Sequence, residues 1–507
     1  MKKSHVFVGL MASFLLLAAG CAPDKAKETA SSSSKTGASS SEVTSGASEK
    51  TYTDVSELQD SYDVVIIGSG GAGMSAAIEA KDAGLKPVIL EKMPTIGGNT
   101  NKASSGMNAS ETKFQTAQGI EDSNDAFYNE TLAGGHGTND PELLRYFVDN
   151  SASAIEWLDE NGITLDNLTI TGGMSTKRTH RPTDGSAVGE YLVKGLYENV
   201  EKRDIPVFVN ADVQSLVEKD NQVTGVKVSI EGQDAVTVNG SAVIVATGGF
   251  GANQDLITQY RADLKGVVTT NQEGSTGDGI KMIEEVGGYA VDMDKIQVHP
   301  TVQQDKGVLI GEAVRGEGAI LVDANGNRFV NEMDTRDKVT AAINALPEKA
   351  AYLIFDQGVR DRATAIEFYD EQGYVEEGKT IDELAGKIKM DAATLSKTLD
   401  AWNTAVTSKS DTAFNRTTGM DEALTTPSYF AIKIAPGIHY TMGGVKINTK
   451  TQVEKKDGST IPGLYAAGEV VGGLHGDNRI GGNSVAEIII FGRQAGTQAA
   501  EFVKSSK

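Results

Sequence analysis

Arginines and histidines in glycine-rich segments are the residues of this chain best suited to chemistry. Guanidinium groups and imidazoles bind carboxylates through charge-assisted hydrogen bonds, and arginine can make two parallel bonds. Taken singly, an arginine is more often part of a surface ion pair and a histidine is more often structural. Gathered around one cofactor, they would form a site for an acidic substrate. The candidates are His299, Glu312, Arg315, Arg336, His439 and Arg479.

A strand, a glycine turn and a helix near residue 70 would place a dinucleotide in the fold. The apolar segment 62–67 runs into Gly-Ser-Gly-Gly-Ala-Gly and then a helix-like stretch that stops at Gly84. Gly68 permits the tight turn, Gly70 lets the backbone approach a pyrophosphate, and Gly73 lets the helix pack on the strand. The helix N-terminus attracts phosphates. A second strand ends in Glu91, at the spacing expected for an acid that binds ribose hydroxyls. These parts in order favour a dinucleotide site over a glycine turn without a ligand.

Small residues recur at the ends of later apolar segments, where a bulky cofactor could lie on the backbone. They follow the second strand at 96–100 and 104–108, and they end a strand at 242–245. Another strand, 463–466, is followed by Gly468 and Glu469, and residues 481–484 open an apolar helix that runs through 496. The 57 glycines and 39% hydrophobic residues suit an α/β protein of two or three domains within 507 residues.

The formal net charge of −22 argues against nucleic acid or an anionic membrane surface as a partner. An anionic substrate would therefore need a locally basic pocket. The single cysteine, Cys21, excludes disulfides, cysteine-ligated zinc, iron–sulfur clusters and a C-x-x-C-H haem attachment within this chain. No metal site is expected.

The N-terminus has the pattern of a secretory signal. Lys2 and Lys3 precede an apolar run too short to span a bilayer, and small residues lead to Cys21. This arrangement resembles a bacterial lipoprotein signal (residues 1–21), in which Cys21 is lipidated; an ordinary signal with an incidental cysteine is the alternative. Residues 22–55 are rich in Ser, Thr, Ala and Lys, and we expect a disordered tether.

From Tyr62 to Phe502 these motifs resemble the flavoprotein family of fumarate reductases and succinate dehydrogenases, in particular the flavocytochrome c fumarate reductases. The resemblance implies an α/β fold with a Rossmann-like FAD-binding domain at 62–295 and 422–505, and an inserted α+β clamp domain at 296–421. It also implies non-covalent FAD, with Asp278 near the isoalloxazine and Ser484 and Val485 at a helix N-terminus facing the ring. The cofactor-binding residues implied are Gly68, Gly70, Ala72, Gly73, Glu91, Asn99, Thr100, Ser104, Ser105, Val213, Asp278, Tyr440, Glu469, Ser484 and Val485.

The same resemblance assigns catalytic roles. His439 and Arg479 would hold one substrate carboxylate, and His299 with the backbone at Glu312 would hold the other. Arg336 would protonate one alkene carbon while flavin N5 delivers hydride to the other, and Glu312 and Arg315 would reprotonate Arg336. A guanidinium acid is reasonable only if the proton passes to a developing carbanion, whose charge the cation also stabilises. The substrate-binding residues implied are Gly106, His299, Gly311, Glu312, His439, Arg479 and Gly482.

One end of the implied pocket departs from the fumarate pattern. Gly311 stands where that pattern has a threonine donor, and Leu309 stands where it has a methionine. We therefore expect this end to be wider and poorer in donors, and Gly311→Thr to improve fumarate binding. Relatives that reduce urocanate or acrylate- and cinnamate-type acids also vary here.

We expect an extracytoplasmic, lipid-anchored reductase of a 2-enoate, with fumarate as the leading substrate. Urocanate or acrylate- and cinnamate-type acids are the alternative substrates. A second enzymatic hypothesis is oxidation in the reverse direction, as in L-aspartate oxidase or ketosteroid dehydrogenase relatives. The non-enzymatic hypothesis is a flavin lipoprotein that only relays electrons. A mere relay has no reason to keep Glu312, Arg315 and Arg336 together.

The electron donor is expected outside the cytoplasm and to be quinol-linked or flavin-based, because the chain has the Ser-rich tether where flavocytochromes carry haem. Two tetrapeptides of the tether, ending at Ser39 and Ser48, resemble sites of covalent FMN attachment. Glu42 stands where that pattern has an aspartate. Chance occurrence in a Ser/Gly/Ala-rich linker is equally plausible.

Overall fold

The computed structural model describes residues 52–506. The expected signal sequence, Cys21, Ser39 and Ser48 lie outside the described residues. The described part starts earlier than expected, because residues 52–55 are held by contacts. The Tyr52 ring packs edge-on against Tyr197, with centroids 6.1 Å apart. The amide of Thr53 donates to the carbonyl of Val207 (3.0 Å), and its hydroxyl accepts from the Val207 amide (2.9 Å). The prediction that the tether extends to residue 55 is therefore wrong, because residues 52–55 belong to the folded part.

The strand–turn–helix–strand unit expected near residue 70 is present. It consists of β1 (Ser61–Ile67), α1 (Gly71–Asp82) and β2 (Pro87–Leu90), with β1 and β2 paired in parallel. Gly68 has φ +105°, and a Cβ there would lie 2.4 Å from the Ala246 carbonyl oxygen. A Cβ on Gly73 would lie 2.0 Å from the Gly68 carbonyl oxygen. Both positions therefore require glycine, one for the turn and one for the close approach of helix and strand.

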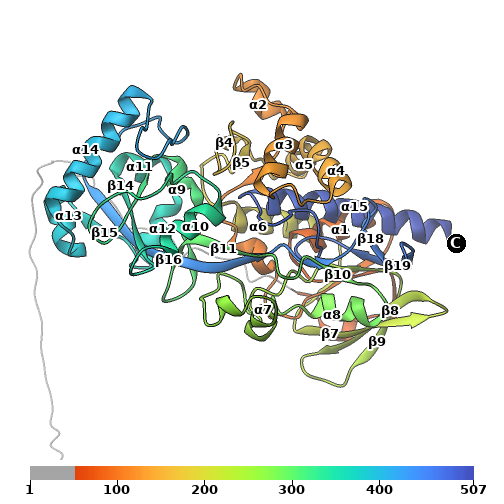
Figure 1. The fold of residues 1–507 in the computed structure, drawn as a ribbon. Helices are drawn as coiled ribbons and strands as arrows, with labels where there is room; N and C mark the ends of the chain where they lie inside the picture. Colours follow the sequence, from red (N-terminus) through yellow and green to blue (C-terminus); the bar gives the residue numbers. More distant parts are fainter. Residues whose placement is uncertain (1–51, 507) are drawn as a thin grey trace, which may run out of the picture. The chain divides into compact units, whose positions relative to one another are not determined.

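This unit lies within an eight-stranded sheet (Figure 1). The strand order is β18-β19-β9-β1-β2-β6, and β8 pairs with both β9 and β7. The pairs β19–β9, β9–β1, β1–β2 and β2–β6 are parallel, so their carboxyl ends share one edge, where ligands bind in such sheets. The remaining strands are β6 (Val207–Phe208), β7 (Ala211–Lys219), β8 (Gln222–Ile230), β9 (Val236–Val245), β18 (Gln452–Glu454) and β19 (Thr460–Ala466).

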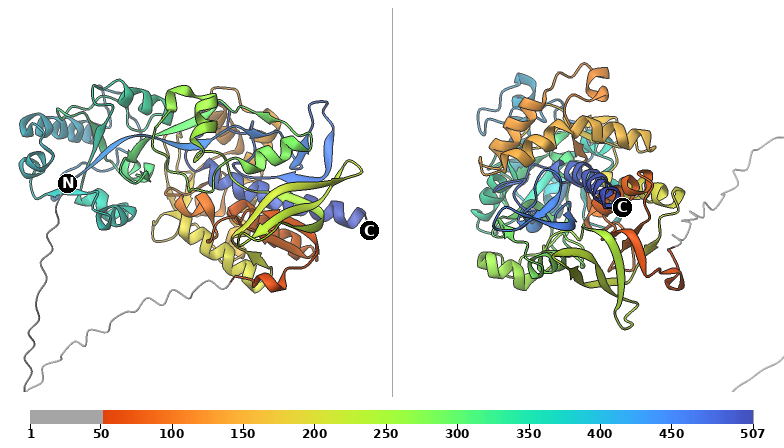
Figure 2. Two further views of the ribbon diagram at one scale, coloured as in Figure 1. Left: turned by 90° about the horizontal axis from the view of Figure 1, so that it is seen from below. Right: turned by 90° about the vertical axis from the view of Figure 1, so that its right-hand side faces the viewer.

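Helices cover this sheet and complete the first hydrophobic core. The C-terminal helix α15 (Asn483–Ser505) packs along α1 (Figures 1 and 2). Several helices begin at a polar cap, as at Ser123 and Asp140, whose side chains accept from amides of the first turn. The other elements here are η1 (Val55–Glu57), η2 (Gly98–Lys102), β3 (Met107–Asn108), α2 (Lys113–Ala117), α3 (Asn124–Gly134), α4 (Pro141–Asp149), α5 (Ser151–Glu160), β4 (Asn167–Thr169), β5 (Thr179–Arg181), α6 (Val188–Lys202), α7 (Gln254–Tyr260), η3 (Ala262–Leu264), α8 (Asp278–Glu285), β10 (Ala290–Val291) and β17 (Gly444–Val445).

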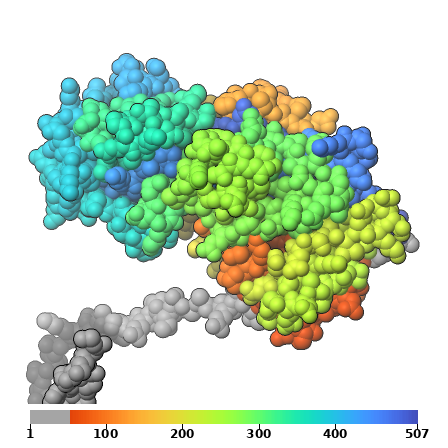
Figure 3. Space-filling model, turned by 60° about the horizontal axis from the view of Figure 1, so that its bottom comes forward, coloured from red at the N-terminus to blue at the C-terminus, as the bar shows by residue number. Residues whose placement is uncertain are grey.

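A second hydrophobic core is formed by residues between Ile310 and Ile434 in the sequence. Much of that stretch, coloured teal to blue, forms one lobe in Figure 3. Its sheet has the order β12-β11-β16-β14-β13, with β15 also paired to β16. The elements are β11 (Ile296–Gln303), β12 (Val308–Leu309), α9 (Glu312–Gly316), β13 (Ile320–Val322), α10 (Arg336–Asn344), β14 (Ala351–Asp356), α11 (Gln357–Arg362), α12 (Ala365–Glu371), β15 (Glu376–Gly378), α13 (Ile381–Ile388), α14 (Ala392–Ser408) and β16 (Tyr429–Thr441).

The long strand β16 joins the two cores. Its first half, from Tyr429 to Ile434, pairs with β14, and its second half, to Thr441, pairs with β11. The second core thus continues past residue 421, the expected end of the clamp. The domain limits 296 and 421, and the mobility of a clamp, stay predictions. Among residues 52–506, no helix is both long and apolar enough to cross a membrane.

Candidate active site

A cavity of about 750 Å³ opens at the carboxyl edge of the parallel strands. Its wall includes the first glycine turn, the segment 98–106, and the loops that follow β9 and β19. Arg336, His439 and Arg479 line the same cavity. The expected cofactor residues that line it are Gly68, Gly70, Ala72, Glu91, Asn99, Thr100, Ser104, Ser105, Val213, Asp278, Tyr440, Glu469, Ser484 and Val485. Gly73 is not part of the wall; it packs against the Gly68 carbonyl.

Glu91 is fixed at the end of β2. Its carboxylate accepts from the amide (2.9 Å) and hydroxyl (2.6 Å) of Ser69 and from the Met93 amide (2.8 Å). These bonds tie the acid to the glycine turn, which suits a shared role in holding an adenosine diphosphate. Asp278 forms an ion pair with Lys92, the residue after Glu91, at 2.5 Å. This contact favours the ADP end of the cavity for Asp278, rather than the expected place beside the isoalloxazine.

The helix α15 points its N-terminus at the other part of the cavity. Gly482, with φ +85°, caps the helix, and Ser484 and Val485 line the wall. Free amides and the dipole of this helix stabilise negative charge. Nearby, Glu469 accepts from the Thr441 amide (3.0 Å) and from the side chain of Asn99 (3.2 Å). Burial raises the pKa of Glu469 to about 7.

The pairing of β11 with β16 brings the two histidines together. His299 stands opposite Gly437, and the rings of His299 and His439 lie 5.2 Å apart, edge to face. Nδ1 of His439 contacts the Thr270 hydroxyl at 2.7 Å. The Arg479 guanidinium lies over the Tyr440 ring, 4.2 Å from its centroid. Its Nε has no hydrogen-bond partner within the described residues, which leaves it available for an anion.

Arg336, Glu312 and Arg315 form a buried chain of charges. Arg336 is the first residue of α10, and it makes two bonds to Glu312: Nε to Oε1 at 2.8 Å and Nη2 to Oε2 at 3.2 Å. Nη2 of Arg315 lies 3.6 Å from the same Oε1. Glu312 and Arg315 do not line the cavity, whereas Arg336 does. Glu312 therefore connects a guanidinium that faces the cavity to one behind it.

The charges of this cluster are unbalanced. Burial, and then the charge of Arg336, lowers the pKa of Arg315 and of Arg479 to about 10, so both stay cationic at neutral pH. Burial raises the pKa of Glu312, but Arg336 and Arg315 outweigh it, and the pKa is lowered. Burial, and then Arg336, holds the pKa of His299 and His439 well below the usual value. Both rings are thus neutral, and the excess positive charge would attract an anionic substrate.

Comparisons with known proteins agree with this geometry. A family model for an FAD binding domain matches residues 63–485. The fumarate reductase (cytochrome) of Shewanella frigidimarina is 43% identical over 90% of this chain and 80% of its own length. The urocanate reductase of Eggerthella lenta is 33% identical over 87% of the chain and 75% of its length. The open conformation of a flavocytochrome c3 fumarate reductase matches with a TM-score of 0.73 and 39% identity, over 88% of this chain and 79% of that one.

The chain belongs to this family of FAD-binding flavoproteins. It is an FAD-dependent oxidoreductase that acts on carbon–carbon double bonds, as expected from the sequence. The NADH:fumarate oxidoreductase of Klebsiella pneumoniae is 53% identical over 87% of the chain. The chain spans only about half of that relative's length (48%).

The end of the pocket near Gly311, called the distal end below, differs from the sequence-based expectation. Gly311 and His299 do not line the cavity, while Ser104 and Tyr369 do. A Cβ on Gly311 would lie 2.8 Å from the Ser104 hydroxyl and 3.5 Å from the Tyr369 hydroxyl. The expectation of a wider, donor-poor end is therefore wrong, because two hydroxyl groups occupy the space beside Gly311. Gly106 and Gly482, also expected to bind substrate, both line the cavity.

The sequence did not indicate that two further residues, Gln297 and Gly481, contribute to the site around Arg336. Gln297 accepts from Nη1 of Arg336 (2.8 Å) and donates to the Arg479 carbonyl (2.6 Å), which links the two arginines. Gly481 lies against the Arg336–Glu312 pair: a Cβ there would be 2.0 Å from Glu312 Oε2. The glycine was noted as helix punctuation, and only the folded chain shows that it makes room for the ion pair.

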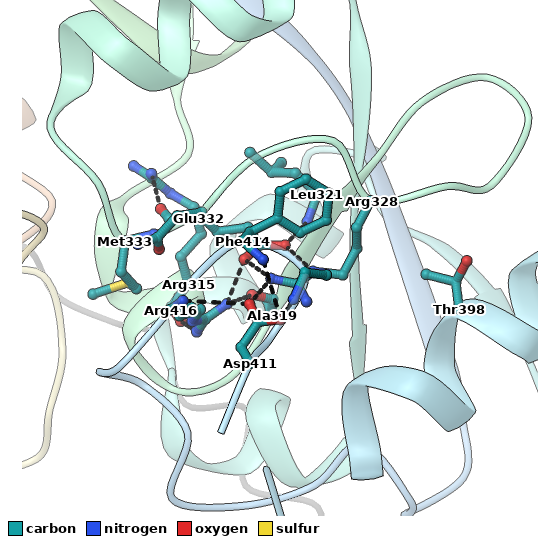
Figure 4. A network of polar contacts seen from close by, with 12 residues as sticks. Arg315, Ala319, Leu321, Arg328, Glu332, Met333, Thr398, Asp411, Phe414 and Arg416 are labelled. Carbon is teal, nitrogen blue, oxygen red and sulfur yellow. Dashed lines mark hydrogen bonds and ion pairs between the residues drawn. The ribbon is translucent and has the colours of Figure 1, made fainter. Parts of the chain in front are cut away.

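A second buried network holds Arg315 from behind (Figure 4). Nη1 of Arg315 donates to the Glu332 carbonyl (2.6 Å), and Arg416 donates to the Arg315 carbonyl (2.7 Å). Arg416 also bonds to the Glu332 carboxylate (3.1 Å), which Arg328 binds with two nitrogens, and Arg328 reaches Asp411 (2.9 Å). These bonds fix Arg315 while leaving its Nε and Nη2 without a hydrogen-bond partner among residues 52–506, although Nη2 keeps its ion pair with Glu312.

Proposed function

We propose that this flavoenzyme reduces the double bond of a 2-enoate, with fumarate as the substrate and succinate as the product. The observation that carries the proposal is the chain Arg336–Glu312–Arg315, which reaches the wall of the cofactor cavity through Arg336; Arg479 lines the same cavity. Burying three charged side chains costs desolvation free energy, because each ion loses its hydration. A functional role would account for keeping them buried. A proton donor with its own resupply provides such a role.

The protein groups divide the work as follows. Arg479 and His439 bind the carboxylate conjugated to the double bond and draw electron density toward it. FAD, held by the residues of the cavity wall, supplies the hydride when it is bound. Arg336 gives its proton to the neighbouring carbon and stabilises the carbanion charge as it develops. Glu312 and Arg315 then return a proton to Arg336.

The test is reoxidation of the reduced protein under anaerobic conditions, with a panel of enoates that includes fumarate, urocanate, cinnamate and acrylate. We expect fumarate to reoxidise it fastest and to yield succinate. The alternative is a reductase of urocanate or acrylate- and cinnamate-type acids, and a fast reaction with one of those acids alone would establish it. Reoxidation by none of them would leave the electron-relay reading.

We also propose that the enzyme acts outside the cytoplasm, anchored to the membrane by a lipid on Cys21. The support is the signal-like segment before the only cysteine. Cys21→Ser should release the protein from the membrane fraction and abolish labelling with a radioactive fatty acid. Membrane association that survives this substitution would contradict the proposal.

We also propose that FMN bound covalently to Ser48 or, second in preference, Ser39 carries electrons from an extracytoplasmic donor to the FAD. Ser48 precedes Tyr52 by four positions, and four residues of extended chain span at most about 14 Å. Intact-mass measurement on protein from its native host should show an added FMN that Ser48→Ala removes. Unmodified peptides spanning both serines would point to a separate quinol-linked or free flavin donor.

A further inference from the structure

Tyr369 lies where the substrate pocket meets α9. Its side chain comes from α12, and only 3% of the residue is exposed. The phenol oxygen accepts a hydrogen bond from the Gly311 amide at 3.0 Å. The backbone that precedes Glu312 is therefore tied to a tyrosine that lines the cavity.

The hydroxyl of Tyr369 keeps its own proton free. Its oxygen accepts from Gly311, and among residues 52–506 no acceptor takes its O–H. Burial raises the pKa of Tyr369 to about 12, so the phenol stays protonated at physiological pH. The Ser104 hydroxyl, which faces the same place beside Gly311, likewise has no hydrogen-bond partner in the described chain.

Two unused donors thus stand where a side chain at position 311 would otherwise project. The space beside Gly311 is closed by Ser104 Oγ at 2.8 Å and Tyr369 Oη at 3.5 Å from the Cβ position. Donors at the wall of a cavity that also holds Arg336 and Arg479 suit an anionic group, because hydrogen bonds to ions are stronger than neutral ones.

We propose that Tyr369 and Ser104 form the distal subsite of the pocket and donate to a second carboxylate on the β carbon of the substrate. The inference rests on the proposed function, and it narrows the substrate to an enedioate. The excess positive charge of the arginine cluster fits a dianion. Tyr369 and Ser104 thereby determine specificity without taking part in proton or hydride transfer.

The test compares fumarate with crotonate, which carries a methyl group in place of the second carboxylate. Anaerobic kcat/KM is measured for wild type, Tyr369→Phe and Ser104→Ala, each loaded with FAD. Tyr369→Phe should lose about ten- to a hundredfold on fumarate, mainly through KM, since a hydrogen bond to a charged group is removed. The loss on crotonate should stay below about threefold, the size of a lost neutral contact.

Tyr374→Phe is the matched control, because the Tyr374 phenol is buried without a partner in the described chain. It should leave both substrates within about twofold of wild type. Tyr369→Phe also removes the acceptor of the Gly311 amide, but such a disturbance would slow both substrates alike. The ratio between substrates is therefore the readout, and FAD content checks folding. Ser104→Ala, which leaves that amide bonded, should shift the ratio in the same direction.

Equal losses on both substrates, or an unchanged ratio in both variants, would overturn the subsite while leaving the reductase intact. A wild-type enzyme that reduces crotonate or an aryl acrylate faster than fumarate would overturn it too. Wild-type protein that reduces no enoate at all would instead remove the proposed function.

Discussion

A methyl group at Gly481 should disable the proton donor without touching it chemically. In Gly481→Ala the new Cβ would lie 2.0 Å from Glu312 Oε2 and 2.8 Å from Arg336 Nη2. Carbon and oxygen atoms attract best at about 3.5 Å, so the carboxylate must move by roughly 1 Å or more. A misplacement of about 1 Å can cost a hundredfold in rate, and loss of a general acid about a hundred- to ten-thousandfold.

We therefore expect kcat for fumarate to fall by at least about a hundredfold in Gly481→Ala. Overpacking should lower the free energy of unfolding by about 1–3 kcal/mol, which leaves a folded enzyme. Stopped-flow reoxidation of the FAD-loaded variant measures the chemical step directly. Gly386→Ala is the control, because its Cβ meets nothing within 4 Å and the residue lies inside α13. Alanine there should leave the rate unchanged and add up to about 1 kcal/mol of stability.

A double variant separates a local effect on Glu312 from a general disturbance. If the methyl group acts through the carboxylate, Gly481→Ala combined with Glu312→Ala should be no slower than Glu312→Ala alone. Two results would refute the assignment of this ion pair to proton transfer. One is a double variant whose loss in kcat equals the product of the two single losses, and the other is a Gly481→Ala enzyme with kcat within about threefold of wild type.

Three other substitutions test the same site. Arg336→Lys should keep FAD and lose kcat by about a thousandfold or more in steady-state assays, because lysine cannot make the two bonds to Glu312; near wild-type turnover would remove the proton-donor role. Gly311→Thr alone should give no gain in fumarate KM, since its Cβ would meet the Ser104 hydroxyl; a lower KM would contradict this. In FAD-free protein, we expect Glu469→Gln to have the same melting temperature as wild type at pH 4.5 and a higher one at pH 8. The folded pKa of Glu469, about 7, exceeds the ordinary 4.5, so wild-type stability falls as pH rises between them; parallel melting curves would refute the raised pKa.

The sequence predicted the parts of the fold that depend on neighbours along the chain. The unit from Tyr62 to Glu91 is an example, because each glycine there serves a turn or contact within the motif. The helix after Gly482 was expected for the same reason. The tether boundary was misplaced because Thr53 pairs with Val207, more than a hundred residues away, and nothing near Thr53 signals that pairing.

Contacts between distant segments explain what was missed at the site. Tyr369 lies 58 residues from Gly311, and the donors expected to be lacking at Gly311 come from α12 and from Ser104. Asp278 was expected beside the isoalloxazine, but its partner Lys92 is 186 residues away. Motifs in the sequence indicate which residues could take part in the site. Which side chains come together in the wall of the cavity depends on how distant segments pack.

The arrangement around Arg336 supports its proposed role as the acid. A guanidinium holds its proton strongly, so it needs a strongly basic acceptor and a source that restores the proton. Glu312 bonds to Arg336 through two oxygens and also faces Arg315. Nε and Nη2 of Arg315 have no hydrogen-bond partner among the described residues. Burial and neighbouring cations lower the pKa of Arg315 to about 10, which makes it a better donor than an exposed arginine. The same crowding of cations that weakens their hold on protons would stabilise the carbanion that hydride addition creates and that the proton from Arg336 then neutralises.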